Sequence, residues 1–187
     1  MNFPELLARR RSIRDYQERA VSPEVVSEIL KDTCLAPSSG NGQPWQFIVV
    51  HNKEWIRRFS EESKKNFVAA IEKDPRSPLK KYEANLRSKE FNVFYNVPCL
   101  VYIGAERSSV SATGLLPGGL LFHVCPAARG LGTCWINLGI EIRNLEIQKA
   151  IGMSEDFRIV APMTLGYPKA VPALPIRNEP KILKMVS

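Results

Sequence analysis

Two kinds of apolar pattern alternate along the chain. Short runs of apolar and often β-branched residues stand at 46–50 (QFIVV), 98–104 (PCLVYIG), 133–136 and 158–165. Runs of this length, bounded by turn-forming residues, predict strands. The runs at 46–50 and 98–104 are almost wholly apolar, so we expect both of these strands to be buried.

Longer stretches carry apolar residues at helical spacing. Residues 3–10, apolar at positions 3, 6 and 7, predict a short amphipathic helix. Ser22 and Pro23 predict the start of a second helix, because serine caps the first amides and proline fits the first helical position. The apolar stripe of this helix runs towards Leu35 and consists of Val25, Val26, Ile29 and Leu30.

Further helices are predicted over residues 54–71, 80–90, 113–131 and 142–151. The segment 74–78 (DPRSP) separates the first two, because its prolines break a helix. Proline inside a helix costs about 3 kcal/mol, so the third is expected to begin near Pro117 and to kink at Pro126. Gly152 is expected to stop the fourth. From Pro168 the chain is proline-rich and is predicted to be extended.

The mixture of strands and helices predicts one layered α/β or α+β domain over residues 1–187. Apolar residues make up 44% of the chain and charged residues 24%, which excludes wholesale disorder. No run approaches the roughly 18 apolar residues of a membrane span. The first residues, MNFPELLARRRS, lack the apolar core of a secretory signal. The expected compartment is therefore the cytoplasm, without membrane attachment.

The cysteines and histidines argue against several kinds of site. The four cysteines are far apart and expected to be reduced and mostly buried: Cys34, Cys99, Cys125 and Cys134. The only two histidines are His51 and His123, so we expect neither a metal site nor a histidine-based nucleophilic site. Both histidines are interpreted as structural or surface residues. If the chain is an enzyme, a bound cofactor is expected to supply its reactivity.

The chain has 26 Lys and Arg residues against 19 Asp and Glu residues, a net charge of +7. Such an excess is one signature of nucleic-acid binding. Between residues 53 and 89, however, the two signs are interleaved, which is typical of a solvated helix surface. We therefore expect no nucleic-acid partner. A second group differs because little acid lies among its members: Arg9, Arg10, Arg11 and Arg14.

This arginine-rich segment is the first candidate for a binding site. In an extended backbone, side chains alternate, so Arg10, Ser12 and Arg14 point to one side. Guanidinium groups and a hydroxyl bind a phosphate monoester by charge-assisted hydrogen bonds. A solvated basic turn stays open as the alternative on these residues alone.

The second candidate is the segment 36–45 (APSSGNGQPW), which leads directly into the strand at 46–50. Ser38, Ser39 and Asn41 offer donors and acceptors that suit a planar heterocycle. The glycines of the segment permit close approach of the backbone. An ordinary polar loop between a helix and a strand would explain the glycines but not the whole combination.

Together these segments resemble the nitroreductase-like family of FMN-dependent oxidoreductases. The matching motifs keep the family's order: RRSIRDY at 10–16, APSSGNGQPWQFIVV at 36–50, NVFYNVPCLVYIG at 92–104, GLGTCWI at 130–136 and LGYPKAVP at 165–172. The resemblance implies an α+β fold with a mainly antiparallel central sheet flanked by helices. It also implies an intertwined homodimer with two FMN sites at the interface. Residues 53–96 would be the variable helical region over the pocket, and residues 168–187 an extended C-terminal tail.

The resemblance implies FMN contacts residue by residue. Arg10 and Ser12, with Arg11 beside them, would hold the phosphate and ribityl end. Arg14 would lie near the pyrimidine edge of the ring, and Arg177 would bind the phosphate. Gln43 would support a loop that lines the ring from the partner subunit and contains Pro37, Ser38, Ser39 and Asn41.

The resemblance also places the backbone of Asn137 and Leu138 near flavin N5. Many relatives have glycines at these two positions, so here two side chains would intrude near N5.

The function implied by the resemblance is NAD(P)H-dependent reduction of nitroaromatic, quinone or similar electron-poor small molecules. Flavin N5 would be the reactive centre, and Arg14 would tune the flavin electrostatically. NADH or NADPH and the acceptor would use one face of the ring in turn, which gives ping-pong kinetics. Two alternatives stay open: a specialised reductase of halogenated aromatics or activated alkenes, and a non-enzymatic FMN-binding or redox-partner module.

Overall fold

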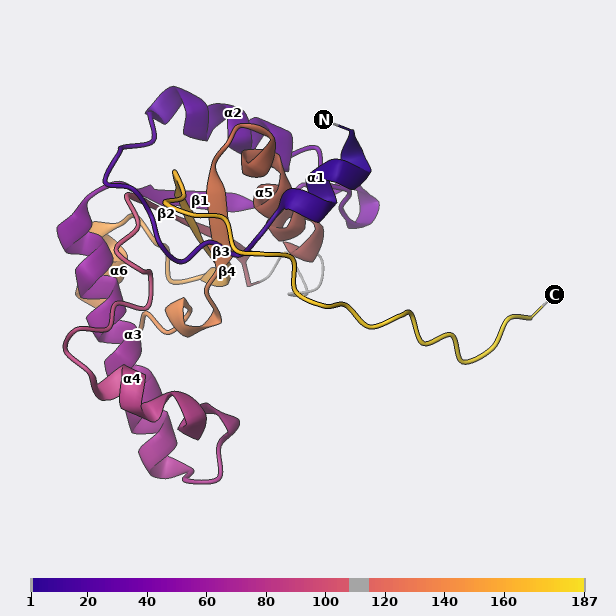
Figure 1. Cartoon of the computed structure of the whole chain (residues 1–187). Coiled ribbons are helices and arrows are strands. Elements are labelled where there is room, and N and C mark those ends of the chain that lie inside the picture. The colour runs from indigo at the N-terminus through magenta and orange to yellow at the C-terminus, as the bar shows by residue number, and fades with distance from the viewer. Residues whose placement is uncertain (1, 108–114, 187) are drawn as a thin grey trace.

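The computed structural model describes residues 2–107 and 115–186. Within these residues, four strands form the central sheet: β1 (Gln46–Val50), β2 (Cys99–Glu106), β3 (Gly132–Trp135) and β4 (Phe157–Gly166). The strands lie in the order β1-β2-β4-β3, and each neighbouring pair is antiparallel (Figure 1). The predicted strands and the α+β class with an antiparallel sheet are confirmed.

The strand β1 is less buried than its apolar sequence predicts. It pairs with β2 and forms an edge of the sheet, and of its five residues Val50 alone is buried. The strand β2 lies between β1 and β4, and every residue from 99 to 105 is buried. The expected burial is therefore wrong for β1, because burial depends on neighbouring elements that local composition does not specify.

Helices cover both faces of the sheet (Figure 1). They are α1 (Phe3–Arg9), α2 (Pro23–Thr33), α3 (Lys53–Lys73), α4 (Glu83–Arg87), α5 (Leu116–Ala128) and α6 (Leu145–Ala150), with 3₁₀ turns at Ser39–Asn41, Pro78–Tyr82 and Asn137–Gly139. The predicted cap is confirmed: the Ser22 side chain accepts a hydrogen bond from the amide of Val25, and Pro23 opens α2. Pro117 lies in the first turn of α5, as predicted. Residues 113 and 114, at the start of the predicted helix, lie outside the described residues.

Two predicted helices have different bounds. The prediction over 80–90 is wrong in part, because a 3₁₀ turn capped by Ser77 precedes α4, and the chain becomes extended again at Ser88. The predicted start at 142 is also wrong. The Asn144 side chain accepts hydrogen bonds from the amides of residues 146 and 147, which sets the start of α6 at Leu145. Gly152, in the left-handed region, follows this helix as predicted.

The core has two parts, one on each face of the sheet. Alternate residues of β2 face opposite ways, as the two-residue period of a strand requires. Tyr102 packs in the cluster that contains Phe59 of α3. Ile103 packs in the other cluster, with Ile29 of α2 and Phe122 of α5. The sheet therefore lies between α3 on one side and α2 and α5 on the other (Figure 1).

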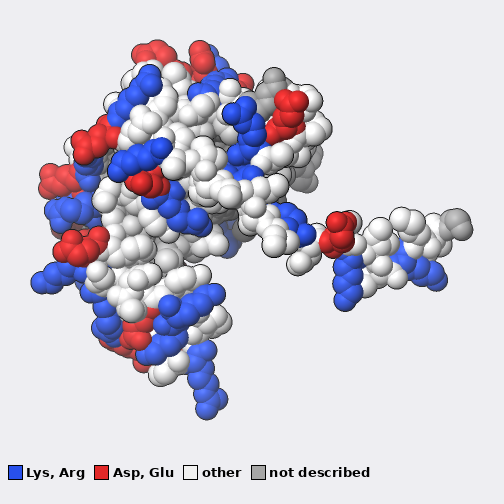
Figure 2. All heavy atoms as spheres, viewed as in Figure 1, with Lys and Arg blue, Asp and Glu red and all other residues white. Residues whose placement is uncertain are grey.

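Charged side chains of both signs are interspersed on the face shown in Figure 2. Arg87 of α4 pairs with Glu83 at 3.0 Å and with Glu72 of α3 at 2.8 Å, and these pairs agree with the interpretation of residues 53–89 as a solvated helix surface. Lys64 of α3 departs from it, because its side chain is buried and pairs with Glu61 at 2.9 Å. Among the described helices, none combines the length and apolar character needed to cross a membrane.

Two segments far apart in sequence meet beside β3 and β4. A parallel bridge joins Ser12 to Thr133, and an antiparallel bridge joins Tyr16 to Pro168. From residue 170 to residue 186 the chain has neither helix nor strand, and its end runs away from the body of the molecule (Figure 1).

Candidate functional site

The segment after α1 is held against the first residues of β3. The amide of Ile13 donates a hydrogen bond to the carbonyl of Thr133 at 2.9 Å. The Ile13 side chain is 3% exposed and packs directly over Gly132. Any side chain at position 132 would overlap Ile13, so glycine is required for this close approach. The arginine-rich segment is therefore fixed to the sheet.

A buried hydroxyl pair adds a second attachment. The Tyr16 hydroxyl donates to the carbonyl of Ile13 at 2.6 Å and lies 2.7 Å from Oγ1 of Thr164. The amide of Cys134 donates to the same Thr164 oxygen at 2.8 Å. Burial raises the pKa of Tyr16 far above its ordinary value, so its phenol keeps its proton. These bonds tie the segment to β3 and β4 together.

Arg10, Ser12 and Arg14 all influence one thiol, that of Cys134. Burial raises the pKa of the Cys134 thiol, whereas Arg14, a hydrogen bond from Ser12, and Arg10 act to lower it. All three groups therefore lie near this sulfur. That Arg10, Ser12 and Arg14 point to one side of the segment stays a prediction. Arg14 also lies over the Tyr95 ring, 5.9 Å from its centroid.

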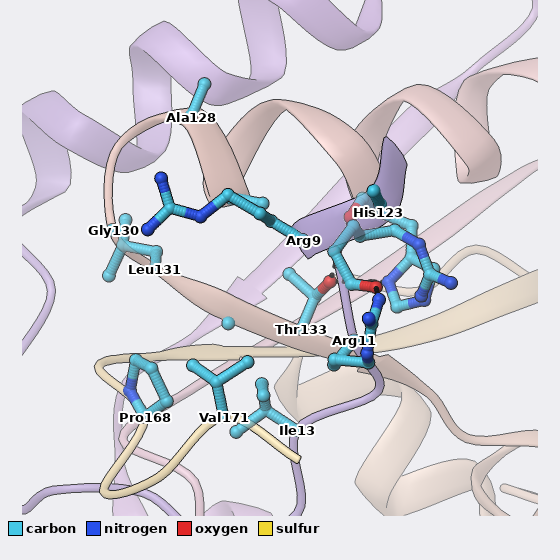
Figure 3. A pocket seen from close by; sticks show the side chains of 14 residues that line it. Arg9, Arg11, Ile13, His123, Ala128, Gly130, Leu131, Thr133, Pro168 and Val171 are labelled. Carbon is cyan, nitrogen blue, oxygen red and sulfur yellow. Dashed lines mark hydrogen bonds between the residues drawn. The ribbon is translucent and has the colours of Figure 1, made fainter. Parts of the chain in front are cut away.

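A cavity of about 530 Å³ lies beside this segment, between the end of α5 and β3 (Figure 3). Arg9, Arg10 and Arg11 line one side of it, and His123 and Thr133 line another. The α5 end of the cavity is shaped by Gly130, which is in the left-handed region, while the amide of Leu131 bonds to the carbonyl of residue 126. This is the glycine turn that often ends a helix.

His123 is the residue of this site that the sequence did not mark. Its Nε2 lies 2.5 Å from a guanidinium nitrogen of Arg10, and its Nδ1 lies 2.5 Å from Oγ1 of Thr133. Burial and, second, the charge of Arg10 lower its pKa to about 4, so the imidazole is neutral at pH 7. No local motif identifies this residue, because its partner Arg10 is 113 positions away.

A third guanidinium joins Arg10 and Arg11 from the C-terminal tail. Arg11 donates to the carbonyl of Ala173 at 3.3 Å, which places the tail beside the segment. The pKa of Arg10 is lowered by burial, by Arg11 and by Arg177, in that order. Among residues 2–107 and 115–186, no carboxylate lies within 4 Å of these three groups. The cluster Arg10, Arg11 and Arg177 is therefore a positive site that the described residues do not neutralise.

The loop of residues 37–43, which was predicted to line a flavin ring, has a defined conformation but does not line the cavity beside Arg10. The Ser38 hydroxyl accepts a hydrogen bond from the amide of Gln43 at 3.0 Å, and the Gln43 side chain donates to Asn41 at 3.3 Å. Asn41 and Gln43 are both in the left-handed region, a costly conformation for residues other than glycine. The residues that line the cavity beside Arg10 do not include this loop, and Pro37, Ser39, Asn41 and Gln43 are exposed. Within one chain, the two predicted halves are not brought together.

Asn137 and Leu138 begin the 3₁₀ turn that follows β3. Asn137 is exposed, and Leu138 packs against the core cluster of Phe94. The backbone of Gly139 lies against the Phe94 ring so closely that a methyl group there would overlap it. The position near a flavin that the resemblance implies for this turn stays a prediction. Nowhere in the described part of the chain do three or more His, Cys, Asp or Glu side chains gather as metal ligands would.

Comparisons with known proteins agree with the resemblance. The Nitroreductase family is matched over residues 7–167. A provisionally assigned NADH dehydrogenase/NAD(P)H nitroreductase of Archaeoglobus fulgidus is 31% identical over 173 residues, which are 88% of this chain and 84% of that protein. An iodotyrosine deiodinase of Thermotoga neapolitana is 28% identical over 185 residues, 94% of this chain and 93% of that protein.

A solved structure shares the fold. The crystal structure of a nitroreductase with bound FMN from Desulfitobacterium hafniense aligns with a TM-score of 0.83 at 20% identity, and the alignment covers both chains completely.

Proposed function

Because this chain belongs to the Nitroreductase family and is an oxidoreductase, we propose that it uses FMN and NADH or NADPH to reduce nitroaromatics, quinones and similar electron-poor small molecules. The donor and the acceptor would occupy one site in turn, which gives ping-pong kinetics.

The four cysteines are free, which fits a reducing compartment such as the cytoplasm. Cys99 and Cys134 are buried, and Cys34 and Cys125 are half-buried.

The cluster of Arg10, Arg11 and Arg177 is the observation that carries this proposal. FMN has a phosphate monoester, and guanidinium groups bind phosphate oxygens by two parallel hydrogen bonds. Since no carboxylate of the described residues neutralises them, the three groups repel one another; the pKa of Arg10 is lowered first by burial and then by the charges of Arg11 and Arg177. A phosphate dianion would remove this repulsion. The donor set of the cluster therefore fits the phosphate end of FMN, and Ser12 adds a hydroxyl beside it.

FMN, when bound, would supply the hydride chemistry of the reaction. Arg14 would provide positive charge near the pyrimidine edge of the ring and so favour the reduced, anionic flavin. Asn137 and Leu138 would contribute backbone amides near N5. None of these residues donates or removes a proton in this proposal, since an arginine keeps its charge at all physiological pH values.

We propose that the site is completed in a homodimer. The loop of residues 37–43 carries exposed polar side chains and costly backbone conformations, which suits a role outside its own chain. Apolar side chains are exposed on α1 and α5 and along the tail, and they include Phe3, Leu7, Leu116, Leu120 and Ile176. Burying them against a second copy would complete both sites at once. Each chain would form one domain, and residues 53–96 would shape access for the acceptor.

The experiment is to purify the protein and measure FMN binding by its visible spectrum, followed by anaerobic titration with NADH and with NADPH. Arg10→Ala and Arg177→Ala are expected to weaken FMN binding about 10–100-fold, the loss of a charge-assisted hydrogen bond. Arg76→Ala removes the same charge from an exposed turn and is the matched control. Full retention of FMN by both site variants would contradict the proposal. FMN binding without oxidation of either nicotinamide would contradict the reductase activity.

A second candidate is reductive dehalogenation of an aromatic substrate. The match to the Thermotoga neapolitana iodotyrosine deiodinase over 94% of this chain favours it. Steady-state kinetics with a nitroaromatic, a quinone and 3-iodo-L-tyrosine distinguish the two candidates. A kcat/KM that is higher by orders of magnitude for the iodinated substrate would identify the specialised enzyme.

A further inference from the structure

The hydrogen bonds around His123 define which ring nitrogen carries the proton. A guanidinium can only donate, so Nε2 of His123 accepts from Arg10 at 2.5 Å. In a neutral ring, Nδ1 must then carry the proton, and it donates to Oγ1 of Thr133 at 2.5 Å. The Thr133 hydroxyl in turn donates to the carbonyl of His123 at 3.4 Å. The hydrogen bonds therefore run in one order of donors and acceptors, from Arg10 to His123 and from His123 to Thr133.

The ring is also held in place from both sides. His123 lies on α5, which ends in the Gly130 turn, and Thr133 lies on β3. Thr133 is 2% exposed, and its carbonyl accepts the bond from Ile13 that holds the arginine-rich segment. The charged groups that face the ring across the cavity come from that segment: Arg9, Arg10 and Arg11.

A neutral acceptor suits an arginine that must bind an anion. A carboxylate in the place of His123 would fix Arg10 equally well, but it would cancel the charge of Arg10 and repel a phosphate. The imidazole engages one nitrogen of the guanidinium and leaves its charge and its other donors free. A protonated imidazole would lose the acceptor at Nε2 and add a like charge.

We propose that His123 is a positioning residue: as the Nδ1–H tautomer, held by Thr133, it fixes the guanidinium of Arg10 in the direction of the FMN phosphate. The role of the phosphate rests on the proposed function. The tautomer and the contact with Arg10 do not, so the two can be tested separately.

The first test is the protonation state of His123 in solution. Since the chain has two histidines, His51→Gln leaves His123 as the single one, and His51 is exposed. Nitrogen-15 NMR of this protein, labelled at histidine and free of FMN, is expected to show a neutral ring at pH 6 with the proton on Nδ1. Thr133→Val is expected to reduce the share of this tautomer. A proton on Nε2, or an imidazolium at pH 6, would overturn the proposal.

The second test compares two ligands that differ only in the phosphate. His123→Leu is expected to weaken FMN binding by about tenfold or more, because Arg10 loses its acceptor. Riboflavin binding is expected to stay unchanged. His123→Gln can place an amide oxygen near the position of Nε2, and it is expected to restore most of the FMN affinity. A purely structural role would change both ligands together.

The outcomes are distinguishable. If the protein with both histidines does not bind FMN, the proposed function fails, while the NMR experiment still decides the tautomer. If it binds FMN and His123→Leu keeps the ratio of FMN to riboflavin affinity, the positioning role is wrong. Should His123→Leu not fold, Thr133→Val carries the comparison of FMN with riboflavin.

Discussion

Acidification is expected to destabilise this protein through His123. In the folded chain its pKa is about 4, against an ordinary value of 6.5. Between these values the unfolded chain binds the proton and the folded chain does not, so folding stability decreases as the pH falls. The loss begins near pH 6.5 and is complete below pH 4. At about 1.36 kcal/mol for each pKa unit, it amounts to about 3 kcal/mol.

The assay is urea denaturation at a fixed protein concentration and ionic strength, at several pH values between 7.5 and 4. Other groups titrate in this range, so the free energy of unfolding is compared with that of His123→Gln at each pH. Between pH 7 and pH 4, the free energy of unfolding of the unsubstituted protein is expected to fall by about 3 kcal/mol more than that of His123→Gln. His51→Gln, at an exposed position, is the control and should follow the unsubstituted protein. A difference that does not change with pH would refute the burial argument for His123.

Three further substitutions test the packing that supports the site. Gly139→Ala would overlap the fully buried Phe94 ring and is expected to lower the free energy of unfolding by about 1–3 kcal/mol. Gly118→Ala is the control and should not lower it, because the nearest neighbours there lie at 3.9 Å. Equal melting temperatures of the two variants would contradict this expectation. Tyr16→Phe removes a buried hydroxyl with two partners, and a loss of about 1–2 kcal/mol is expected in urea denaturation, while no loss would argue against the bond to Ile13. Lys64→Met leaves the carbonyls of Ser88 and Phe91 without their buried ammonium donor. Faster amide hydrogen exchange and faster proteolytic cleavage are therefore expected in residues 88–91. Unchanged protection of this loop would contradict the expectation.

The strands could be predicted from the sequence because their signal is local. Short apolar runs bounded by turns located all four described strands, and the Ser22–Pro23 pair located the start of α2. Burial was less accessible. The run QFIVV has the composition of a central strand, but it lies at an edge of the sheet because of the order in which the strands pair. That order is a property of the whole chain.

The same distinction between local and long-range signals applies to the candidate site. The prediction that Arg10, Ser12 and Arg14 point to one side needs only the alternation of an extended backbone, which local sequence supplies. The role of His123 could not be predicted from local sequence. Its significance depends on α5 ending where β3 begins and on β3 pairing with the segment after α1. A single histidine in an apolar helix carries no sign of either event.

The pairing of the arginine-rich segment with β3 also has a consequence for biosynthesis. Residues 10–16 leave the ribosome long before their partners at 133 and 168 have been translated. Until then, a basic stretch of nascent chain has no docking partner on the sheet, and closing so long a loop is slow compared with forming local helices. The contacts of the arginine-rich segment with β3 are therefore expected to be among the last to form, so truncated translation products would lack them even where most of the polypeptide is present.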